Sequence, residues 1–416
     1  MAQALGGEFL TDLNWIMSSG FLGLRFYDLP NFFLCLLFVL IGSKAFKIRP
    51  NIQLVLVLHC MLPFFLNEFL FPTSYLGDQF RYWRQFNAIR SGELSLLDAL
   101  FSGGNVEQSA ALFALMPIPL AVSPISLGFA NTFLWVALFF WLYQKKVFTP
   151  VSVWFYLLYP SMALYTGLSL RDTFIFVFMV MAVQWAREGR WLPMLLIFIP
   201  LYAIKFQNFF ILAPVLVVYL LFGIRRKGVS VFRGIAMLVV GIVSLIVVSP
   251  IALPLINLFR SAMYAEDGGD RDQLELIDGP GEFVAEGLTS GFYFLLKPFP
   301  WEASGLLQLI QSAENIAIAV LLALIIRAAW RRVPKKLIFW LLFMAFALSI
   351  YGLVVFNYGT AARYRYPFLV IFVVFVCADC HVRSLFKPFA PAHWRVGRQA
   401  PAEITASPQA PRNHST

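Results

Sequence analysis

Long apolar runs separated by short polar turns make up most of this chain. Most of them have the length that crosses a hydrocarbon core of roughly 30 Å as a helix rising about 1.5 Å per residue. The strands of an outer-membrane barrel would alternate apolar and polar positions instead. The pattern therefore predicts an all-α, polytopic transmembrane bundle. The eleven predicted spans are 30–46, 53–71, 126–144, 147–164, 172–187, 191–204, 207–224, 231–257, 305–328, 336–356 and 364–382.

Three segments do not fit the pattern of simple spans. Residues 13–27 form either a twelfth span or an amphipathic helix on the outer surface. Residues 109–124 are apolar but interrupted by prolines, which predicts a short interfacial or re-entrant helix. From about residue 386 the chain is rich in Pro, Ala, Arg and Ser, which cannot build a core. We therefore expect one transmembrane domain over 1–385 and a disordered tail over 386–416.

The composition supports a membrane protein and excludes a soluble enzyme. Hydrophobic residues make up 60% of the chain and charged residues only 13%, too few for the charged shell of a soluble domain. The four cysteines lie in apolar runs, so no disulfide framework is implied, and the sequence predicts no metal site. The chain has no Walker loop, HExxH motif or dinucleotide fingerprint, which argues against ATP-driven transport by this chain alone.

The distribution of charge predicts an orientation in the membrane. Most of the 32 basic residues fall in alternate turns and in the C-terminal segment, whereas the segment 260–302 is acidic. By the positive-inside rule, the basic turns and the tail are cytoplasmic. The N-terminus and the loops 72–125 and 258–304 then face outward. The net charge of +10 is explained in this way without a nucleic-acid partner.

Several basic residues break this rule because they lie beside the outer ends of predicted spans. Each of them singly is explained by snorkelling to lipid headgroups or by local pairing. Taken together, guanidinium and ammonium groups at one interface indicate a site for phosphate oxygens. The candidate phosphate-binding residues are Arg81, Arg84, Arg171, Lys205, Arg363 and Arg365.

Asp78 is the candidate general base. It precedes a basic, aromatic stretch expected to form a helix over Gln79 to Ile89, and it adjoins both the membrane interface and two arginines. Acidic residues inside or beside spans are functional candidates for the same electrostatic reason, with buried pairing as the alternative. Further candidates are Glu68, Asp172, Glu314, Tyr364 and Trp301.

Several segments resemble known membrane enzymes. The stretch GDQFRYWRQFNAIRSGE, which begins at Gly77, is similar to the first outer loop of GT-C-type glycosyltransferases. The stretch ARYRYPFLVIF is similar to the entry of a late helix in those enzymes and in surface-polysaccharide polymerases, and two further stretches, YPSMALYTGLSLRDTFIF and LLKPFPWEA, resemble segments of O-antigen-polymerase-like proteins. The chain departs from the family in having Gln79 where a second carboxylate is often found, and in placing Asp78 after the second predicted span.

The resemblance implies a GT-C-like fold in the bacterial inner membrane and a polyprenyl-(pyro)phosphate-linked sugar or oligosaccharide as donor. The acceptor would be a glycan, a lipid or a protein, and the enzyme either a single-sugar transferase or a repeat-unit polymerase. Asp78 would deprotonate the acceptor hydroxyl, the candidate cations would hold the leaving phosphate, and Trp301 in loop 258–304 would help to cover the sugar. We predict no cofactor and leave a divalent metal open. The alternative is a transporter or flippase of lipid-linked sugars.

Overall fold

The computed structural model describes residues 26–66, 77–101, 103–224, 228–266, 269–270 and 274–385. Within these ranges every regular element is a helix, as predicted. The helices are α3 (Leu29–Ala45), α4 (Pro50–Cys60), α5 (Leu62–Leu66), α6 (Asp78–Ser91), α7 (Leu96–Phe101), α8 (Asn105–Ala114), α9 (Ile125–Gln144), α10 (Pro150–Leu158), α11 (Pro160–Gly167), α12 (Asp172–Glu188), α13 (Trp191–Ile204), α14 (Phe206–Leu221), α16 (Val231–Glu266), α17 (Pro280–Leu296), the 3-10 turn η3 (Pro300–Glu302), α18 (Leu306–Trp330), α19 (Pro334–Val354) and α20 (Tyr358–Asp379).

Each predicted span coincides with one helix or with two helices separated by a break. Among the described helices, four are long and apolar enough to cross a membrane as they stand, namely α9, α18, α19 and α20. The bent pair of α11 and α12 makes five. The chain is thus a helical membrane protein. Its described residues form fewer continuous membrane-length helices than the eleven or twelve expected spans, because several of the helices are short or interrupted.

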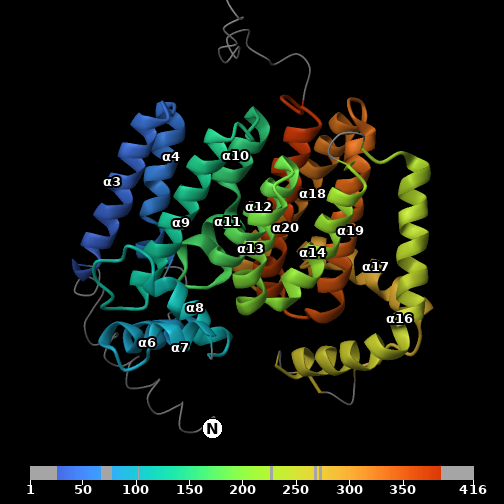
Figure 1. Ribbon diagram of the computed structural model, residues 1–416, viewed down its shortest axis with the longest axis horizontal. Coiled ribbons are helices and arrows are strands. Elements are labelled where there is room, and N and C mark those ends of the chain that lie inside the picture. The colour runs from blue at the N-terminus through green and yellow to red at the C-terminus, as the bar shows by residue number, and fades with distance from the viewer. Residues whose placement is uncertain are drawn as a thin grey trace, which may run out of the picture.

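Proline explains several of the interruptions. Pro160 follows directly on the break between α10 and α11, and Pro63 lies in the short helix that continues α4. Pro250 and Pro254 lie inside α16, which runs down one edge of the molecule and then turns along its lower end (Figure 1). A helix that loses a backbone donor bends at that point, so an apolar run does not by itself define a straight span.

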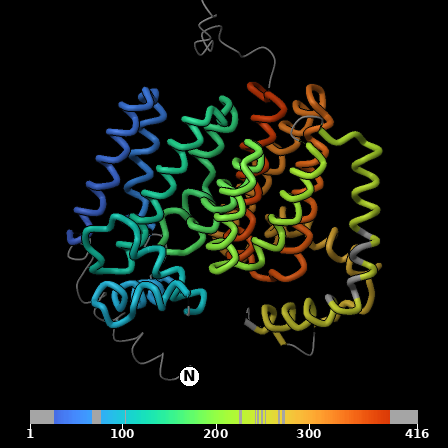
Figure 2. The backbone as a smooth tube through the Cα atoms, viewed as in Figure 1, coloured from blue at the N-terminus to red at the C-terminus, as the bar shows by residue number. Residues whose placement is uncertain are grey.

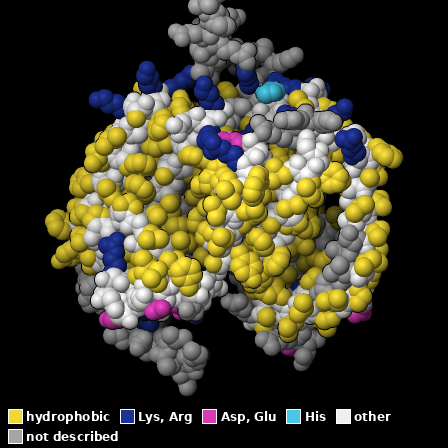
Figure 3. All heavy atoms as spheres, viewed as in Figure 1, with side chains coloured by type: hydrophobic (Ala, Val, Ile, Leu, Met, Phe, Trp, Pro, Cys, Tyr) yellow, Lys and Arg dark blue, Asp and Glu magenta, His cyan; other side chains and the backbone are white. Residues whose placement is uncertain are grey.

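The two ends of the bundle differ in charge. The turns after α3, α9, α12 and α18 and the end of α20 lie at one end, which we call the basic end (Figure 1). Lys and Arg side chains gather there, acidic side chains gather at the opposite end, and a hydrophobic surface lies between them (Figure 3). Helices α6, α7 and α8 lie at the opposite end, which we call the site end. The tube view shows the chain from α6 to α8 at this end, below the longer helices (Figure 2).

The expected loops 72–125 and 258–304 are largely helical where the structure describes them. The helix expected over Gln79 to Ile89 is present as α6. In 109–124, α8 ends at Ala114 and the proline-containing remainder is not a helix. Within 258–304, α16 continues to Glu266 and α17 packs along α19, so this segment is not an irregular loop where the structure describes it.

Glycine makes the contact between α17 and α19 close. A Cβ atom at Gly352 would lie 2.4 Å from the Ser290 carbonyl, and one at Gly291 would lie 2.9 Å from the Ser349 nitrogen. Small residues allow the backbones of packed membrane helices to approach in this way. Gly291 of α17 and Gly352 of α19 therefore allow the close packing of a helix that lies within the expected loop 258–304. Glu68, the tail 386–416 and all of 13–27 except its last two residues lie outside the described residues.

Candidate functional site

The turn between α11 and α12 brings charged residues to the site end. The chain bends by 120° between the two helices. It reaches the site end through α11 and turns back toward the basic end in α12. Asn131, buried on α9, donates from Nδ2 to the carbonyls of Leu168 at 2.6 Å and Leu170 at 2.7 Å. These bonds satisfy carbonyls that the break in the helix leaves without partners, which the interior of a membrane protein requires.

Gln79 and Ser169 fix the same turn to neighbouring elements. The Ser169 backbone N–H donates to Oε1 of Gln79 at 3.1 Å, and the Ser169 hydroxyl donates to the carbonyl of Pro124. Gln79 is 1% exposed, so a carboxylate there would place a negative charge in an apolar setting. The amide at this position therefore has a structural role as the acceptor that joins α6 to the turn.

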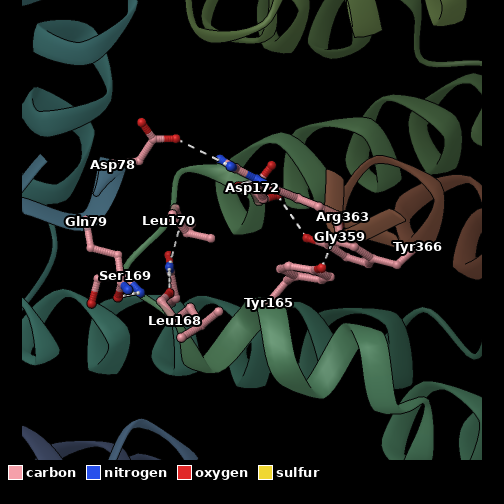
Figure 4. A network of polar contacts seen from close by, with 11 residues as sticks. Asp78, Gln79, Tyr165, Leu168, Ser169, Leu170, Asp172, Gly359, Arg363 and Tyr366 are labelled. Carbon is pink, nitrogen blue, oxygen red and sulfur yellow. Dashed lines mark hydrogen bonds and ion pairs between the residues drawn. The ribbon is translucent and has the colours of Figure 1, made fainter. Parts of the chain in front are cut away.

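Arg363 of α20 lies between two carboxylates that come from distant parts of the chain (Figure 4). Its Nε donates to Oδ2 of Asp172 at 2.7 Å, and its Nη1 lies 3.4 Å from Oδ2 of Asp78. The Asp172 side chain is 6% exposed and that of Asp78 is 41% exposed. The short, buried contact holds Arg363 in place, whereas the longer one leaves Asp78 open to solvent.

Two tyrosines hold α20 against the turn. The Tyr366 hydroxyl donates to the carbonyl of Asp172 at 3.1 Å, and the Tyr165 hydroxyl donates to the carbonyl of Gly359 at 2.9 Å (Figure 4). Their rings stack with centroids 5.7 Å apart. These hydrogen bonds and the ring stacking fix the position of α20, and with it Arg363, relative to Asp172. Both tyrosines therefore position the site.

The start of α20 differs from the sequence expectation. The sequence predicts the last span over 364–382, which would place Arg363 just before its first turn. Instead α20 begins at Tyr358, and the Asn357 side chain caps it by accepting from the N–H of Gly359 at 2.8 Å. Arg363 therefore lies inside the helix, and its position is set by side-chain pairing rather than by a helix terminus.

Three further predicted cations surround Arg363 at the site end. Arg81 lies 3.9 Å from Asp78 with 65% of its side chain exposed, and Arg171 donates to the carbonyl of Asn105 at 3.4 Å. Lys205 is buried, with its ammonium 4.0 Å from the centre of the Tyr364 ring. We call the set Asp78, Arg81, Arg171, Asp172, Lys205, Arg363 and Tyr364 the outer cluster. It has four cationic and two anionic side chains.

Tyr82 adds a neutral hydroxyl to the outer cluster. Its side chain is buried against α8, and burial raises the pKa of its hydroxyl above the usual value, although the nearby charges of Arg171 and Arg363 oppose that shift. The hydroxyl is therefore protonated at physiological pH. It lies among the charged groups as a hydrogen-bond donor for an anionic ligand.

Arg365 faces a different part of the bundle from Arg363. It is 1% exposed, and its Nη1 donates to the carbonyls of Phe294 at 2.8 Å and Leu295 at 2.7 Å. Its Nη2 donates to Oδ1 of Asn315 at 2.5 Å. These carbonyls belong to the last turn of α17, where a cation is stabilised by the helix dipole. The structure thus places Arg365 as a cap of α17.

The remaining predicted residues lie apart from the outer cluster. Glu314 of α18 accepts from the Ser161 hydroxyl at 2.6 Å and from its N–H at 3.3 Å, so it caps the start of α11. Trp301 is 80% exposed and stacks on Phe299. Arg84 is half-buried on α6 and is not part of the pairing between Asp78, Arg363 and Asp172. In the described part of the chain, no three His, Cys, Asp or Glu residues are grouped as metal ligands.

An apolar cavity of about 400 Å³ lies between α14, α16, α17 and α19. It extends along α19 from Phe339 to Leu353, and its lining is apolar except for Ser349. The surface is hollowed beside α16, where that helix stands away from the others (Figure 3). On the same helix, Tyr351 donates from its hydroxyl to Asn208 and packs on the Tyr364 ring, so α19 joins the cavity to the outer cluster.

Sequence reasoning found the charged residues of the site but missed those that position them. Asn131 lay in no motif, and Tyr165 and Tyr366 lay in stretches quoted for a resemblance but were given no role. The signal for all three was a polar side chain within an otherwise apolar run. Comparison with protein-family models, with curated proteins and with solved structures finds no match to this chain.

Proposed function

We propose that the chain is a membrane glycosyl transfer enzyme that uses a polyprenyl-(pyro)phosphate-linked sugar donor. The observation that carries this proposal is the outer cluster, in which a solvent-accessible carboxylate, Asp78, lies beside a partly buried guanidinium, Arg363, among further cations. A site of this kind combines a proton acceptor with groups that stabilise a departing phosphate. The positive-inside rule assigns the basic end to the cytoplasm and the cluster to the opposite face.

The two distances at Arg363 support a division of roles. Asp172 holds Nε at 2.7 Å, while the contact from Nη1 to Asp78 is longer, at 3.4 Å. A donor phosphate would replace Asp78 as the partner of Nη1, with Arg171 and Lys205 contributing further positive charge. Asp78 would then accept the proton of the acceptor hydroxyl. As the acceptor oxygen bonds to the anomeric carbon, the bond from that carbon to the phosphate oxygen breaks and its electron pair stays on the phosphate.

The apolar cavity supports a lipid-linked donor. Its lining from Phe339 to Leu353 of α19 lies between the two ends of the molecule, at the height of the hydrophobic surface. In a membrane this surface is surrounded by hydrocarbon chains. A polyprenyl chain lying there would approach the outer cluster along α19 and past Tyr351. A water-soluble donor would make no use of such a cavity.

The bend between α11 and α12 supports a second candidate, a transporter or flippase of lipid-linked sugars. Broken helices that meet at a polar site are typical of transporters. Here the chain bends by 120° between α11 and α12, and Arg171 and Asp172 lie at the end of that bend. The two functions differ in what accumulates when the chain is missing, because a flippase loss retains the lipid-linked sugar in the cytoplasmic leaflet.

Asp78→Asn tests the enzymatic role. The amide keeps the shape of the side chain but does not accept a proton, and loss of a general base slows a reaction by roughly 10²–10⁴-fold. We expect a deletion strain carrying Asp78→Asn to make truncated or unpolymerised surface glycan and to accumulate unreacted lipid-linked sugar, measured by gel and by mass spectrometry. Asp98→Asn on α7 of the same end is the matched control. Wild-type glycan from Asp78→Asn at equal protein level would remove Asp78 from the mechanism.

A further inference from the structure

A second cavity lies at the basic end, opposite the outer cluster. Its volume is about 310 Å³, and it is bounded by the last residues of α9, α12 and α20, by Tyr219 of α14 and by the first turn of α19. Most of its lining side chains are charged or polar. They are Lys145, Lys146, Gln184, Arg187, Glu188, Lys336 and Asp379.

The two carboxylates of this cavity are already paired. Asp379 accepts from Nε of Arg187 at 3.0 Å and from Nε1 of Trp340 at 3.1 Å. Glu188 lies 2.9 Å from Nζ of Lys145. Glu188 also lies 3.7 Å from Nε of Arg190, which is not part of the lining. Each carboxylate therefore balances one cation of the lining, and the pairs bind the ends of neighbouring helices together. The charge of the cavity is decided by the cations that remain.

Those cations are Lys146, just after α9, and Lys336, in the first turn of α19. Neither forms an ion pair with a carboxylate among the residues that the structure describes. The cavity thus carries two positive charges in excess. The first turn of α19 adds the partial positive charge of a helix N-terminus.

We propose that this basic cavity binds a phosphate group, supplied either by the headgroup of an anionic phospholipid or by a soluble phosphate. Two ammonium groups on flexible stems suit a tetrahedral oxyanion, which they approach as point charges. The cavity lies where the hydrophobic surface gives way to charged side chains, and basic pockets between membrane helices at this level bind anionic headgroups (Figure 3). The bound group would connect α9 with α19 through Lys146 and Lys336.

The test uses the full chain, purified in a neutral detergent, and measures its unfolding temperature. The probes are dioctanoyl phosphatidylglycerol, dioctanoyl phosphatidylcholine and inorganic phosphate. A ligand that binds only the folded state raises the unfolding temperature by an amount that grows with the logarithm of 1 + [L]/Kd. We expect a rise that depends on phosphatidylglycerol concentration in this way, none with phosphatidylcholine, and an apparent affinity at least tenfold weaker in Lys146→Gln/Lys336→Gln. A rise with inorganic phosphate as well would assign the site to the phosphate group itself rather than to the lipid.

Two variants make the result specific to this cavity. Lys47→Gln/Lys335→Gln removes two charges of the same end, and Lys47 has the same left-handed backbone as Lys146, with φ of 53° against 54°. It should bind phosphatidylglycerol as the native chain does, and Lys146→Arg/Lys336→Arg should retain binding. Equal weakening in the control pair, or no response of the native chain to phosphatidylglycerol or phosphate, would overturn the proposal.

Discussion

Arg363 illustrates why the chemistry of the outer cluster requires a guanidinium. Its Nε and Nη1 atoms reach Asp172 and Asp78 at the same time, at 2.7 Å and 3.4 Å. An ammonium is a single point charge and does not reproduce this planar arrangement of donors. Because Asp172 is buried and Asp78 is not, the guanidinium stays fixed while one of its edges remains open to a ligand.

Arg363→Lys should therefore reduce glycan synthesis without removing the protein from the membrane. The lysine keeps a positive charge near Asp172, so the buried carboxylate is not left without a counter-ion. The lysine cannot pair with Asp172 and reach a phosphate through a second fixed donor, and we expect activity to fall by about 10²-fold, the size of effect seen when one preorganised donor to a developing charge is removed. Glycan yield at matched protein level is the measurement. Wild-type yield would show that any cation suffices at this position.

Arg365→Lys should have the opposite profile. The Arg365 guanidinium donates to two carbonyls of the last turn of α17 and to Asn315. Hydrogen bonds from charged groups contribute about 1.5–3 kcal/mol each, so loss of even one should lower the unfolding temperature of the purified chain. The residual folded protein should keep its activity per molecule. A variant of normal stability with impaired activity would instead return Arg365 to the phosphate-binding site, as the sequence alone suggested.

At the scale of elements, α12 and α20 are joined by an ion pair at each end. The helix that supplies the carboxylate at one end supplies the guanidinium at the other. At the site end, Asp172 of α12 pairs with Arg363 of α20; at the basic end, Arg187 of α12 pairs with Asp379 of α20. Both helices run from the site end to the basic end, so the two pairs fix their register (Figure 1). The outer cluster is thus supported by an interaction at the far end of the same helices.

The distal pair can be tested by a double-mutant cycle with Arg187→Gln, Asp379→Asn and the combined variant. Removal of one partner leaves the other charge half-buried, so each single variant should be less stable than the native chain. The double variant should lose less than the sum of the two, with a coupling of about 0.5–3 kcal/mol in the free energy of unfolding. Strictly additive losses would show that the pair does not join the helices energetically.

Hydropathy predicted where the helices lie because burial in a bilayer demands long apolar segments with internal backbone hydrogen bonds. It did not predict α17, whose Gly291 lets it pack closely against α19 although its sequence contains Glu282 and Glu286. Short-range pattern reading also does not distinguish a straight span from a broken one. The turn between the predicted spans 147–164 and 172–187 was expected, but its hydrogen bonds to Asn131, a residue far away in the sequence, were not.

The sequence predicted the charged residues of the candidate site but not which of them contact one another. Asp78, Arg171 and Arg363 were identifiable because an outward charge beside a span is costly without a task. Their assembly depends on contacts between α6, α12 and α20, which no local spacing encodes. Arg363 and Arg365 look equivalent in the sequence, yet they lie on different faces of α20 and contact different helices.

At the scale of the whole molecule, the separation of charge between the two ends predicts how the chain lies in a membrane. The outer cluster lies at the end with α6 to α8, and the basic cavity lies at the other, beside the C-terminal ends of α9, α12 and α20 (Figure 1). In a bacterial inner membrane the positive-inside rule places the basic end in the cytoplasm. Lipid-linked donors would then react on the outer face.

This orientation can be measured by single cysteines labelled with an impermeant thiol reagent in intact cells whose outer membrane has been permeabilised. The native Cys35, Cys60, Cys377 and Cys380 are all buried, so they should contribute little background. Leu97→Cys lies on α7, where the side chain is 64% exposed, and should be labelled. Arg331→Cys, exposed in the turn between α18 and α19, should be labelled only after the inner membrane is disrupted. The reverse pattern would place the outer cluster in the cytoplasm. A sugar donor there would be nucleotide-linked rather than a flipped lipid-linked sugar. The proposed reaction at the outer face would then be wrong.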